Sequence, residues 1–574
     1  MQPTAGFADP RVRRYITPVR VVWQSDESSV GSAQCLLDPR PPQAVFTHQA
    51  NCVLRNDGTE PGIVLDFGSE LNGGIALTVH TISRLDGRTA MPLARVRIRL
   101  GESVAEVMGQ TNNDHAVHDM VVPVSLLGCH EYGNTGMRFA RIDLIESDCR
   151  LELRAVHAVA IERPLERIGS FWCSDERISR VWDVGARTVE LCMQTYLWDG
   201  IKRDRLVWVG DMHPETMVID AVFGPHPIVP ASLDLVRDHT PLGEWMNGIS
   251  SYSIWWVLVQ HSHFLHGGDV GYLVAQRDYL LGLLDQLIAC VGPDGVERMP
   301  AWRFLDWPSS GDEAAIHAGL HALLSMGLDR GARLARALGN SAVADRCVAA
   351  YAKMRSHVPP AGQSKQAAAL LALSGLVSAE QANREVLAVQ PLQGVSTFYG
   401  YYMLEARALA GDVSGGLELI RRFWGAMLDM GATSFWEDFS LDWLGPDVVG
   451  IDQLVKPNQR SIHADFGAHC YKGLRHSLCH GWAAGPTAWL SRHVLGVRPL
   501  ESGCRTVRVR PALGNLQWVE GAVPTPAGPV RVKAKRDASN EVKCEVDAPS
   551  GVRVLTGQEA AQADANTFSG PAWF

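Results

Sequence analysis

The sequence predicts a multidomain protein in which an all-α domain lies between two β-domains. Apolar residues recur at every second position from about residue 12 to 165, at spacings of three and four from about 174 to 497, and again at every second position after about 499. At a soft prior of about 150 residues per domain, the 574 residues allow two to four domains. The predicted domains are therefore residues 1–167, 168–498 and 499–574.

The first domain is predicted to be an antiparallel β-sandwich. Residues 95–100 alternate strictly between arginine and apolar side chains, which places one face of a strand against a core. Residues 63–67, 75–79 and 151–161 follow the same pattern, and glycine and aspartate separate these short runs. An α+β domain would need helical periodicity, and the sequence has none of any length in this region.

The second domain is predicted to consist of helical hairpins. Ser174 is a suitable N-cap for a long amphipathic helix that carries Ile178, Val181 and Trp182 on one face. Apolar stripes and helical stretches continue over residues 280–288, 316–324, 340–357, 364–374, 378–388, 397–410, 413–430 and 483–495. Because the connectors are short, a ring of hairpins, an α/α toroid, is the simplest arrangement. An extended solenoid is the alternative, but it should show a repeat of fixed period, which the sequence lacks.

The third domain is predicted to be a smaller β-sandwich. Alternating strand patterns return in residues 506–510, 530–533 and 541–546.

Charge and composition exclude several classes of partner. Lys and Arg number 53 against 62 Asp and Glu, so no basic excess is available for nucleic-acid phosphates. No run approaches the ~18 consecutive apolar residues of a membrane span, and the first ten residues lack the basic and apolar regions of a secretory signal. The twelve cysteines are dispersed without a C-x-x-C pair, which indicates reduced thiols and a cytoplasmic protein.

Signatures of nucleotide, zinc and serine-nucleophile chemistry are absent from the sequence. It contains no G-x-x-x-x-G-K-[ST], no strand-linked G-x-G-x-x-G, no H-E-x-x-H and no G-x-S-x-G. His261 and His263 stand two positions apart, and such pairs do not share a helix face, so we expect no metal there. The sequence predicts no cofactor.

The densest chemical stretch is residues 198–211, predicted to be a loop with glycine hinges. Carboxylates, cations and indoles interleave here: Trp198, Asp199, Lys202, Arg203, Asp204, Arg205, Trp208 and Asp211. One interpretation is a solvated charge run, the usual fate of such clusters. The two tryptophans favour another, because surface loops rarely contain them and buried charges persist only when paired. Carboxylates that bind hydroxyls, arginines that orient and indole faces that cover C–H surfaces together suit a sugar pocket.

Four later segments repeat this combination of aromatic and polar residues in the connections between predicted helices. Each alone is more often structural than functional, but a toroid gathers such connections around one pocket. The candidate substrate-binding residues they add are Trp245, Asn247, Trp302, Asp306, Trp307, Trp436 and His480, and they also supply the carboxylate of Glu437.

Three ordered motifs resemble those of bacterial α-L-rhamnosidases of glycoside hydrolase family 78. The family's D-x-x-x-R-[E]-x-L-x-W-x-G-D falls in register with Asp199, Arg203, Asp204, Leu206, Trp208, Gly210 and Asp211. Its G-A-T-T-x-W-E is similar to residues 431–437, and its S-L-N-H to residues 477–480. The resemblance is strong over residues 165–500 and loose in the flanking β-domains.

The resemblance implies an (α/α)6 barrel of six hairpins and an exo-acting hydrolase that releases terminal α-L-rhamnose, or a related deoxy sugar, with inversion. By position, Asp204 is the general acid, and Glu437 is the general base that activates water. Asp199 and Asp211 bind sugar hydroxyls, with Arg203 and His480 beside them. In inverting enzymes the two carboxyl groups stand ~6.5–9.5 Å apart to admit that water. The implied partner is an oligosaccharide or glycoside, bound by a monomer or homodimer.

One departure from the family pattern concerns the acid. The family's usual Glu is Asp204 here, which shortens the reach of the carboxyl by roughly 1.5 Å. Gly200 and Ile201 also replace a usual Cys-Pro, so the chain resembles a divergent subgroup. Two alternatives stay open from the residues: a hydrolase or lyase of the same fold acting on another sugar, such as a uronic acid, and a carbohydrate-binding protein without catalysis.

Overall fold

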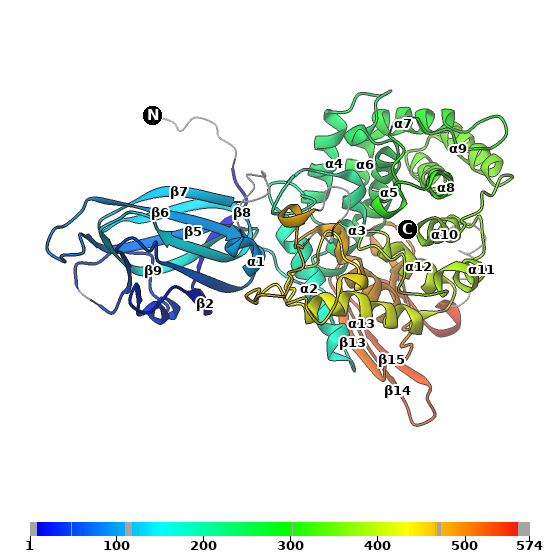
Figure 1. The fold of residues 1–574 in the computed structure, drawn as a ribbon. Coiled ribbons are helices and arrows are strands. Elements are labelled where there is room, and N and C mark those ends of the chain that lie inside the picture. The colour runs from blue at the N-terminus through cyan, green and yellow to red at the C-terminus, as the bar shows by residue number, and fades with distance from the viewer. Residues whose placement is uncertain are drawn as a thin grey trace.

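A computed structural model describes residues 8–47, 49–109, 118–300, 302–464, 467 and 472–560 of the chain. An N-terminal β-domain is joined to one side of a larger helical domain, and the C-terminal strands lie against the helices (Figure 1). All cysteines in the described residues are free, and Cys470 lies outside them. In these residues no helix is both long and apolar enough to cross a membrane.

The N-terminal domain is an antiparallel sheet of nine strands. Along the main path the order is β3-β4-β9-β5-β8-β6-β7, while β1 pairs with β9 and β2 with β5. The alternation in residues 95–100 buries Val96, Ile98 and Leu100 in one apolar core, as the period-two pattern predicts. The strands are β1 (Val12–Ile16), β2 (Arg20–Gln24), β3 (Val30–Gly31), β4 (Cys52–Asn56), β5 (Gly62–Ser83), β6 (Leu93–Gly101), β7 (His118–Ser125), β8 (Cys129–Leu144) and β9 (Cys149–Glu162).

A short helix, α1 (Val104–Met108), interrupts this domain, contrary to the expectation that it contains no helix. Ser103 caps α1 by accepting a hydrogen bond from the Glu106 amide at 3.1 Å, and the Glu106 carboxylate accepts one from the Glu102 amide at 2.9 Å. Five residues are too few to produce a helical period. The S-x-x-E signature of a capping box is the signal that could have revealed α1.

The helical domain begins with α2, one residue later than predicted. The carboxylate of Asp175 caps α2 by accepting hydrogen bonds from the amides of Arg177 and Ile178, whereas the Ser174 hydroxyl accepts one from Gln517 of the C-terminal domain. The helices are α2 (Glu176–Cys192), α3 (Val209–Val222), α4 (Ile228–Asp238), α5 (Ser250–Gly267), α6 (Val270–Ala275), α7 (Arg277–Ala289), α8 (Glu313–Ala337), α9 (Ser341–Met354), α10 (Lys365–Leu373), α11 (Ala379–Ala382), α12 (Gly400–Leu409), α13 (Val413–Asp429) and α14 (Gly485–Trp489).

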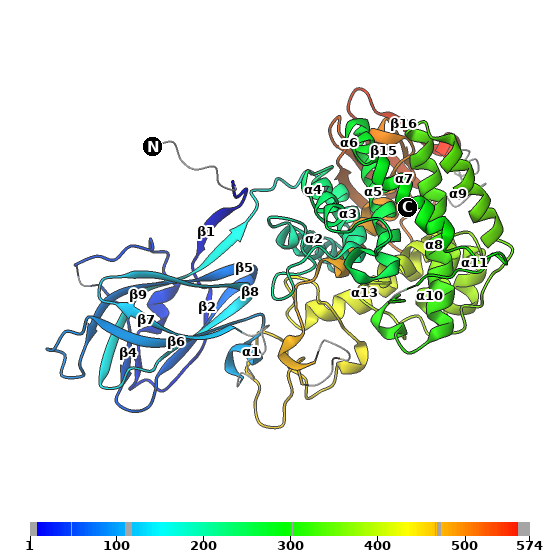
Figure 2. The same cartoon turned by 90° about the horizontal axis from the view of Figure 1, so that it is seen from above.

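Contacts between helices run around the helical domain and return to their start. Helix α3 packs against α5, α5 against α8, α8 against α10, α10 against α12, α12 against α14, and α14 again against α3. Other helices pack against this series, such as α9 on α8 (Figure 2) and α13 on α12. Because the last helix of the series contacts the first, these helices do not form an extended solenoid.

The C-terminal strands form two small sheets. The larger is antiparallel with the order β10-β13-β14-β15, and the smaller has the order β11-β12-β16, in which β12 and β16 are parallel. Strand β10 precedes the first helix in the chain but pairs with β13, so the C-terminal sheet includes a strand from before the helical domain. The strands are β10 (Ser170–Cys173), β11 (Val497–Pro499), β12 (Thr506–Val509), β13 (Trp518–Val523), β14 (Val530–Arg536), β15 (Val542–Asp547) and β16 (Arg553–Leu555).

We predict that Gly521→Ala destabilises the pairing of β10 with β13. A Cβ at Gly521 would lie 2.2 Å from the carbonyl oxygen of Ser170, a backbone atom that cannot move without shifting the strand. The free energy of unfolding measured in urea should fall by about 1–3 kcal/mol. Gly311→Ala is the matched control, because a Cβ there meets no heavy atom within 4 Å. Equal losses in the two variants would contradict this packing argument.

Candidate active site

The segment between α2 and α3 carries the densest group of candidate residues. It is irregular from residue 199 to 208, as predicted, but α3 already begins at Val209. Gly210 and Asp211 therefore lie in the first turn of a helix, not in a loop. The Asp211 carboxyl lies in the turn where the helix dipole favours negative charge.

A cavity of about 70 Å³ gathers most of the predicted site residues. Nine of them line it: Asp199, Arg203, Asp204, Trp208, Asp211, Trp302, Trp307, Glu437 and His480. The remaining lining residues, Ile249, Tyr252, Phe304 and Trp482, are apolar or aromatic. Residues about 240 positions apart in the chain thus share one cavity.

A single guanidinium joins the two candidate catalytic carboxylates. Arg203 Nη2 donates to both carboxylate oxygens of Glu437, at 2.5 Å for Oε1, and Arg203 Nη1 lies 3.4 Å from Asp204 Oδ2. Because both nitrogens belong to one planar guanidinium, Glu437 Oε1 and Asp204 Oδ2 are at most about 8 Å apart. Arg203 and Glu437 have side chains that are only 4% exposed, whereas Asp204 is 28% exposed.

The backbone at Asp204 has an uncommon conformation. Asp204 has φ 56° and Arg205 has φ 57°, so two consecutive non-glycine residues occupy the left-handed region. Such residues cost of order 1–3 kcal/mol each and persist where the surrounding structure holds them. Here the Asp199 amide donates to the Leu206 carbonyl and the Leu206 amide donates to the Asp199 carboxylate, which closes the turn around Asp204.

Buried acids and one histidine form the polar wall of the cavity. His480 Nε2 lies 3.0 Å from Asp211 Oδ1, and His480 Nδ1 lies 4.0 Å from Glu437 Oε1. Burial alone would lower the pKa of His480, but the charge of Glu437 and the hydrogen bond to Asp211 outweigh it and raise this pKa to about 9. Burial raises the pKa of Asp199 well above its ordinary value, and it also raises that of Asp211, although the hydrogen bond to His480 opposes the second rise.

The segments that carry Glu437 and His480 are held by backbone hydrogen bonds. The Glu437 amide donates to the Ser477 carbonyl, and the His480 amide donates to the Phe435 carbonyl. The carbonyl of Glu437 accepts from the Thr397 hydroxyl at 2.6 Å and from the Trp482 indole at 2.9 Å. The position of the Glu437 side chain is thus fixed from both sides of its backbone.

A second cavity of about 260 Å³ adjoins the first and shares Trp307, Glu437 and Trp482 with it. Asp306, predicted to bind substrate, lines this second cavity and accepts hydrogen bonds from Ser396 and Gln366. Asp438, which the sequence analysis did not single out, faces the same space. Burial raises the pKa of Asp306 to about 6 and that of Asp438 to about 7.

Four predicted substrate-binding residues line neither cavity: Arg205, Trp245, Asn247 and Trp436. Arg205 donates to the Ile201 carbonyl and to the Asn72 side chain, so it points to the β-domain. Asn247 donates to the Val207 carbonyl and accepts from the Val209 amide, which holds the start of α3 instead of a ligand.

The two tryptophans of this group are occupied by packing. Trp436 is fully buried and meets Phe439 and His476 edge to face. Trp245 is partly buried and packs against the main apolar core. A motif fixes which residue type stands at a position, but not where its side chain points.

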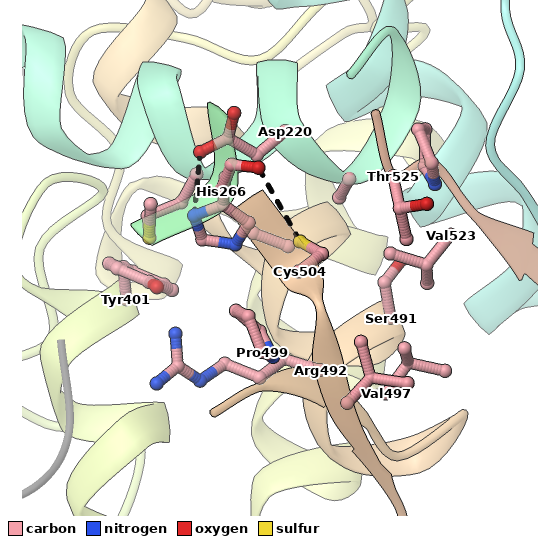
Figure 3. Close-up of a pocket in the computed structure, with 15 residues that line it drawn as sticks. Asp220, His266, Tyr401, Ser491, Arg492, Val497, Pro499, Cys504, Val523 and Thr525 are labelled. Carbon is pink, nitrogen blue, oxygen red and sulfur yellow. Dashed lines mark hydrogen bonds and ion pairs between the residues drawn. The ribbon is translucent and has the colours of Figure 1, made fainter. Parts of the chain in front are cut away.

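A third cavity lies between the helices and the C-terminal strands, and it has the residues but not the chemistry of a nucleophile site (Figure 3). His266 Nδ1 lies 3.1 Å from Asp220 Oδ2, and the Cys504 thiol donates to the His266 carbonyl at 3.6 Å. Burial raises the pKa of Cys504 to about 12, so the thiolate is not available at neutral pH. The cavity measures about 30 Å³, less than half the volume of the first cavity.

The described residues contain no group of three or more His, Cys, Asp or Glu arranged to hold a metal ion. The side chains of the first cavity can accept hydrogen bonds from hydroxyls, transfer protons and cover apolar C–H surfaces. The geometry therefore suits a neutral, hydroxyl-rich ligand.

Two family models match the chain. The bacterial alpha-L-rhamnosidase 6 hairpin glycosidase domain matches residues 166–389, and the bacterial alpha-L-rhamnosidase C-terminal domain matches residues 496–562. Together they cover about half of the 574 residues. No protein of curated function matches.

Solved structures of similar fold are described as rhamnosidases. A family 78 rhamnosidase of Bacillus sp. GL1 is 22% identical with a TM-score of 0.73, over 92% of this chain and 56% of that one. A rhamnosidase from Klebsiella oxytoca with rhamnose bound is 19% identical with a TM-score of 0.68, over 84% of this chain and 96% of that one. A Streptomyces avermitilis α-L-rhamnosidase complexed with L-rhamnose is 16% identical with a TM-score of 0.66, over 86% and 48%. At such identities the likeness shows a shared fold, and this chain spans little more than half the length of the first of these proteins.

We predict that a charged His480 stabilises the folded protein in a pH-dependent way. A folded pKa of about 9, above the ordinary 6.5, contributes free energy that is fully present below pH 6.5 and lost as the pH rises through 9. A shift of this size corresponds to roughly 3 kcal/mol. Unfolding in urea at pH 6 and pH 9.5 should show this loss in the parent protein and a smaller one in His480→Gln. His239→Gln, at an exposed histidine, is the control, and an unchanged pH dependence in His480→Gln would exclude a charged His480.

Proposed function

Because the chain belongs to the bacterial α-L-rhamnosidase family of glycoside hydrolases, we propose that it is an exo-acting inverting glycosidase. Its substrate is an oligosaccharide or glycoside that ends in α-L-rhamnose or a related deoxy sugar. The observation that carries this proposal is the pair of carboxylates, Asp204 and Glu437, which line one cavity and are held by one arginine.

Inversion is the stereochemistry that the family resemblance implies, and the pair of carboxylates admits it. Glu437 Oε1 and Asp204 Oδ2 are at most about 8 Å apart, a limit that is compatible with the ~6.5–9.5 Å of inverting enzymes. In the proposed reaction Asp204 donates a proton to the glycosidic oxygen. Glu437 takes a proton from water as that water attacks the anomeric carbon from the opposite face. The more exposed of the two, Asp204, lies where the leaving group departs to solvent.

The walls of the cavity support a deoxy sugar as the bound unit. Asp199, Asp211 and His480 offer polar atoms to the ring hydroxyls, and Trp208, Trp302 and Trp307 offer flat faces to its C–H surfaces. Ile249, Tyr252 and Phe304 supply apolar surface of the kind that a methyl group, in place of a hydroxymethyl, can contact.

The charge of the site disfavours a uronic acid. Asp199, Asp211 and Glu437 line the first cavity, and Asp306 and Asp438 line the second. The two cationic groups of the first cavity, Arg203 and His480, already face its own carboxylates. An anionic sugar would therefore meet carboxyl groups without a dedicated cation, which costs binding energy.

The finer architecture is part of the same proposal. The closed series of helix contacts supports an (α/α)6 barrel. The N-terminal sandwich stays a prediction from the sequence, since the nine strands of that domain form one connected antiparallel sheet. A cytoplasmic location and a monomeric or homodimeric state stay predictions from the sequence.

We predict that Asp204→Asn and Glu437→Gln each lower the rate of release from an aryl α-L-rhamnoside by at least about 10³-fold. Each change removes the titrating oxygen and keeps the size of the side chain. Rates are measured by aryl release, and proton NMR of the first-formed sugar should show the β-anomer. Asp442→Asn, at an exposed position, is the control and should keep the parent rate.

The same assay separates the alternatives. A panel of aryl glycosides and natural oligosaccharides identifies the sugar. An unsaturated uronide, detected by its ultraviolet absorbance, would replace the hydrolase with a lyase. Tight sugar binding without turnover, unchanged by Glu437→Gln, would replace the enzyme with a binding protein. Normal activity in Asp204→Asn would assign proton donation to another residue.

A further inference from the structure

The N-terminal β-domain contacts the active-site segments through two buried carboxylates. Glu102 follows β6 and Glu106 lies in α1, at the end of the domain that faces the helices (Figure 1, Figure 2). Their side chains are 0% and 2% exposed. A buried carboxylate at a domain boundary lowers the stability of the folded protein unless a cation or a hydrogen-bond donor pairs with it. The contacts of Glu102 and Glu106 therefore show what these acids do.

The first contact is Lys202, two residues before Asp204. Lys202 Nζ lies 3.0 Å from Glu106 Oε1 and 3.7 Å from Glu102 Oε2, and its side chain is 1% exposed. The same ammonium donates to the carbonyls of Leu474 at 2.6 Å and His476 at 3.1 Å. Lys202 therefore joins three parts of the chain: the β-domain, the segment of Asp204 and the segment that leads to His480.

The second contact is the amide of Leu478, which donates to Glu102 Oε2 at 2.6 Å. Its neighbour Ser477 accepts from the Glu437 amide at 3.0 Å and donates its own amide to Glu437 Oε2 at 3.4 Å. One carboxylate oxygen of Glu102 thus faces both the ammonium beside Asp204 and the segment that positions Glu437.

The local structure makes Glu102 and Glu106 rigid. The Ser103 cap and the hydrogen bond from the Glu102 amide to the Glu106 carboxylate fix the two residues relative to each other. Burial raises the pKa of Glu102 to about 7, while the charge of Lys202 and the Leu478 amide oppose the rise. Two acids thus face one ammonium in a site closed to solvent.

We propose that Glu102 and Lys202 are positioning residues, through which the β-domain fixes the acid-bearing segment relative to the base-bearing segment. The inference rests on the proposed function, because it assigns them an effect on the reaction of Asp204 and Glu437. It gives the β-domain a role in the chemistry itself, although neither Glu102 nor Lys202 lines the cavity. A misplacement of about 1 Å between reacting groups can lower a rate about 100-fold, so such a contact can control turnover.

Kinetics of Glu102→Ala, Glu102→Gln and Lys202→Met test this role. For Glu102→Ala and Lys202→Met we expect kcat to fall about 10- to 100-fold with KM within about twofold of the parent. Glu102→Gln should recover most of the rate, because its amide oxygen still accepts from Leu478. Glu102 Oε1, which has no hydrogen-bond partner in the described residues, is the place for the new NH2 group.

Arg20→Ala is the matched control for weakened docking between the domains. Arg20 contacts the helical domain at Asp452, pairs with Asp66 of its own domain, and does not line the cavity; its side chain is 45% exposed. The Arg20→Ala variant should lose the small amount of thermal stability that a surface contact contributes, and its kcat should equal that of the parent. If Glu102→Ala and Lys202→Met keep the parent kcat, or lose activity only in proportion to unfolded protein, the proposal is wrong.

Hydrogen exchange gives a readout that needs no substrate. Amides in residues 199–208 and 474–480 should exchange faster in Glu102→Ala than in the parent, and no faster in Arg20→Ala. Where Glu102→Ala does not fold, Lys202→Met gives the same comparison. A parent protein that cleaves no glycoside would refute the proposed function. Hydrogen exchange would still test the positioning role of Glu102 and Lys202. If the parent is active and the variants keep its hydrogen exchange and its kcat, the positioning role of Glu102 and Lys202 alone is refuted.

Discussion

The candidate site depends on one buried guanidinium, that of Arg203, placed between Glu437 and Asp204. Arginine keeps its charge at any physiological pH and offers donors in a fixed plane, so it sets both the distance between the two carboxylates and the charge between them. Its own Nε donates to the Arg475 carbonyl at 2.9 Å, which ties the same group to a third segment. Segments that are distant in the chain therefore meet around a single side chain.

More acidic than basic groups surround the Arg203 guanidinium. Three buried acids, Asp199, Asp211 and Glu437, share the cavity with Arg203 and with His480, whose pKa is raised. Burial raises the pKa of Asp199 well above its ordinary value, and a protonated carboxyl group donates one hydrogen bond as well as accepting others. A mixed set of neutral and charged oxygens is suited to the hydroxyl groups of a sugar, each of which is donor and acceptor at once.

Some features could be predicted from the sequence because they depend on local repetition. Periods of two and of three to four located the strands and helices, and the ordered motifs named seven of the nine predicted residues that line one cavity. Helix α1 has five residues, too few for a period, and only its cap identifies it. Arg205, Asn247 and Trp436 line neither cavity, because side-chain direction depends on tertiary contacts that the sequence pattern does not show. Glu102 stands in another domain, so no spacing rule links it to Asp204.

The pairing of β10 with β13 has a consequence for biosynthesis. Ser174 and Gln517, which share a hydrogen bond at the end of these strands, are 343 positions apart. At about 5–20 residues per second, β10 leaves the ribosome roughly 20 to 70 s before its partner exists. The sheet β10-β13-β14-β15 can therefore close only after Val523, the last residue of β13, has been synthesised.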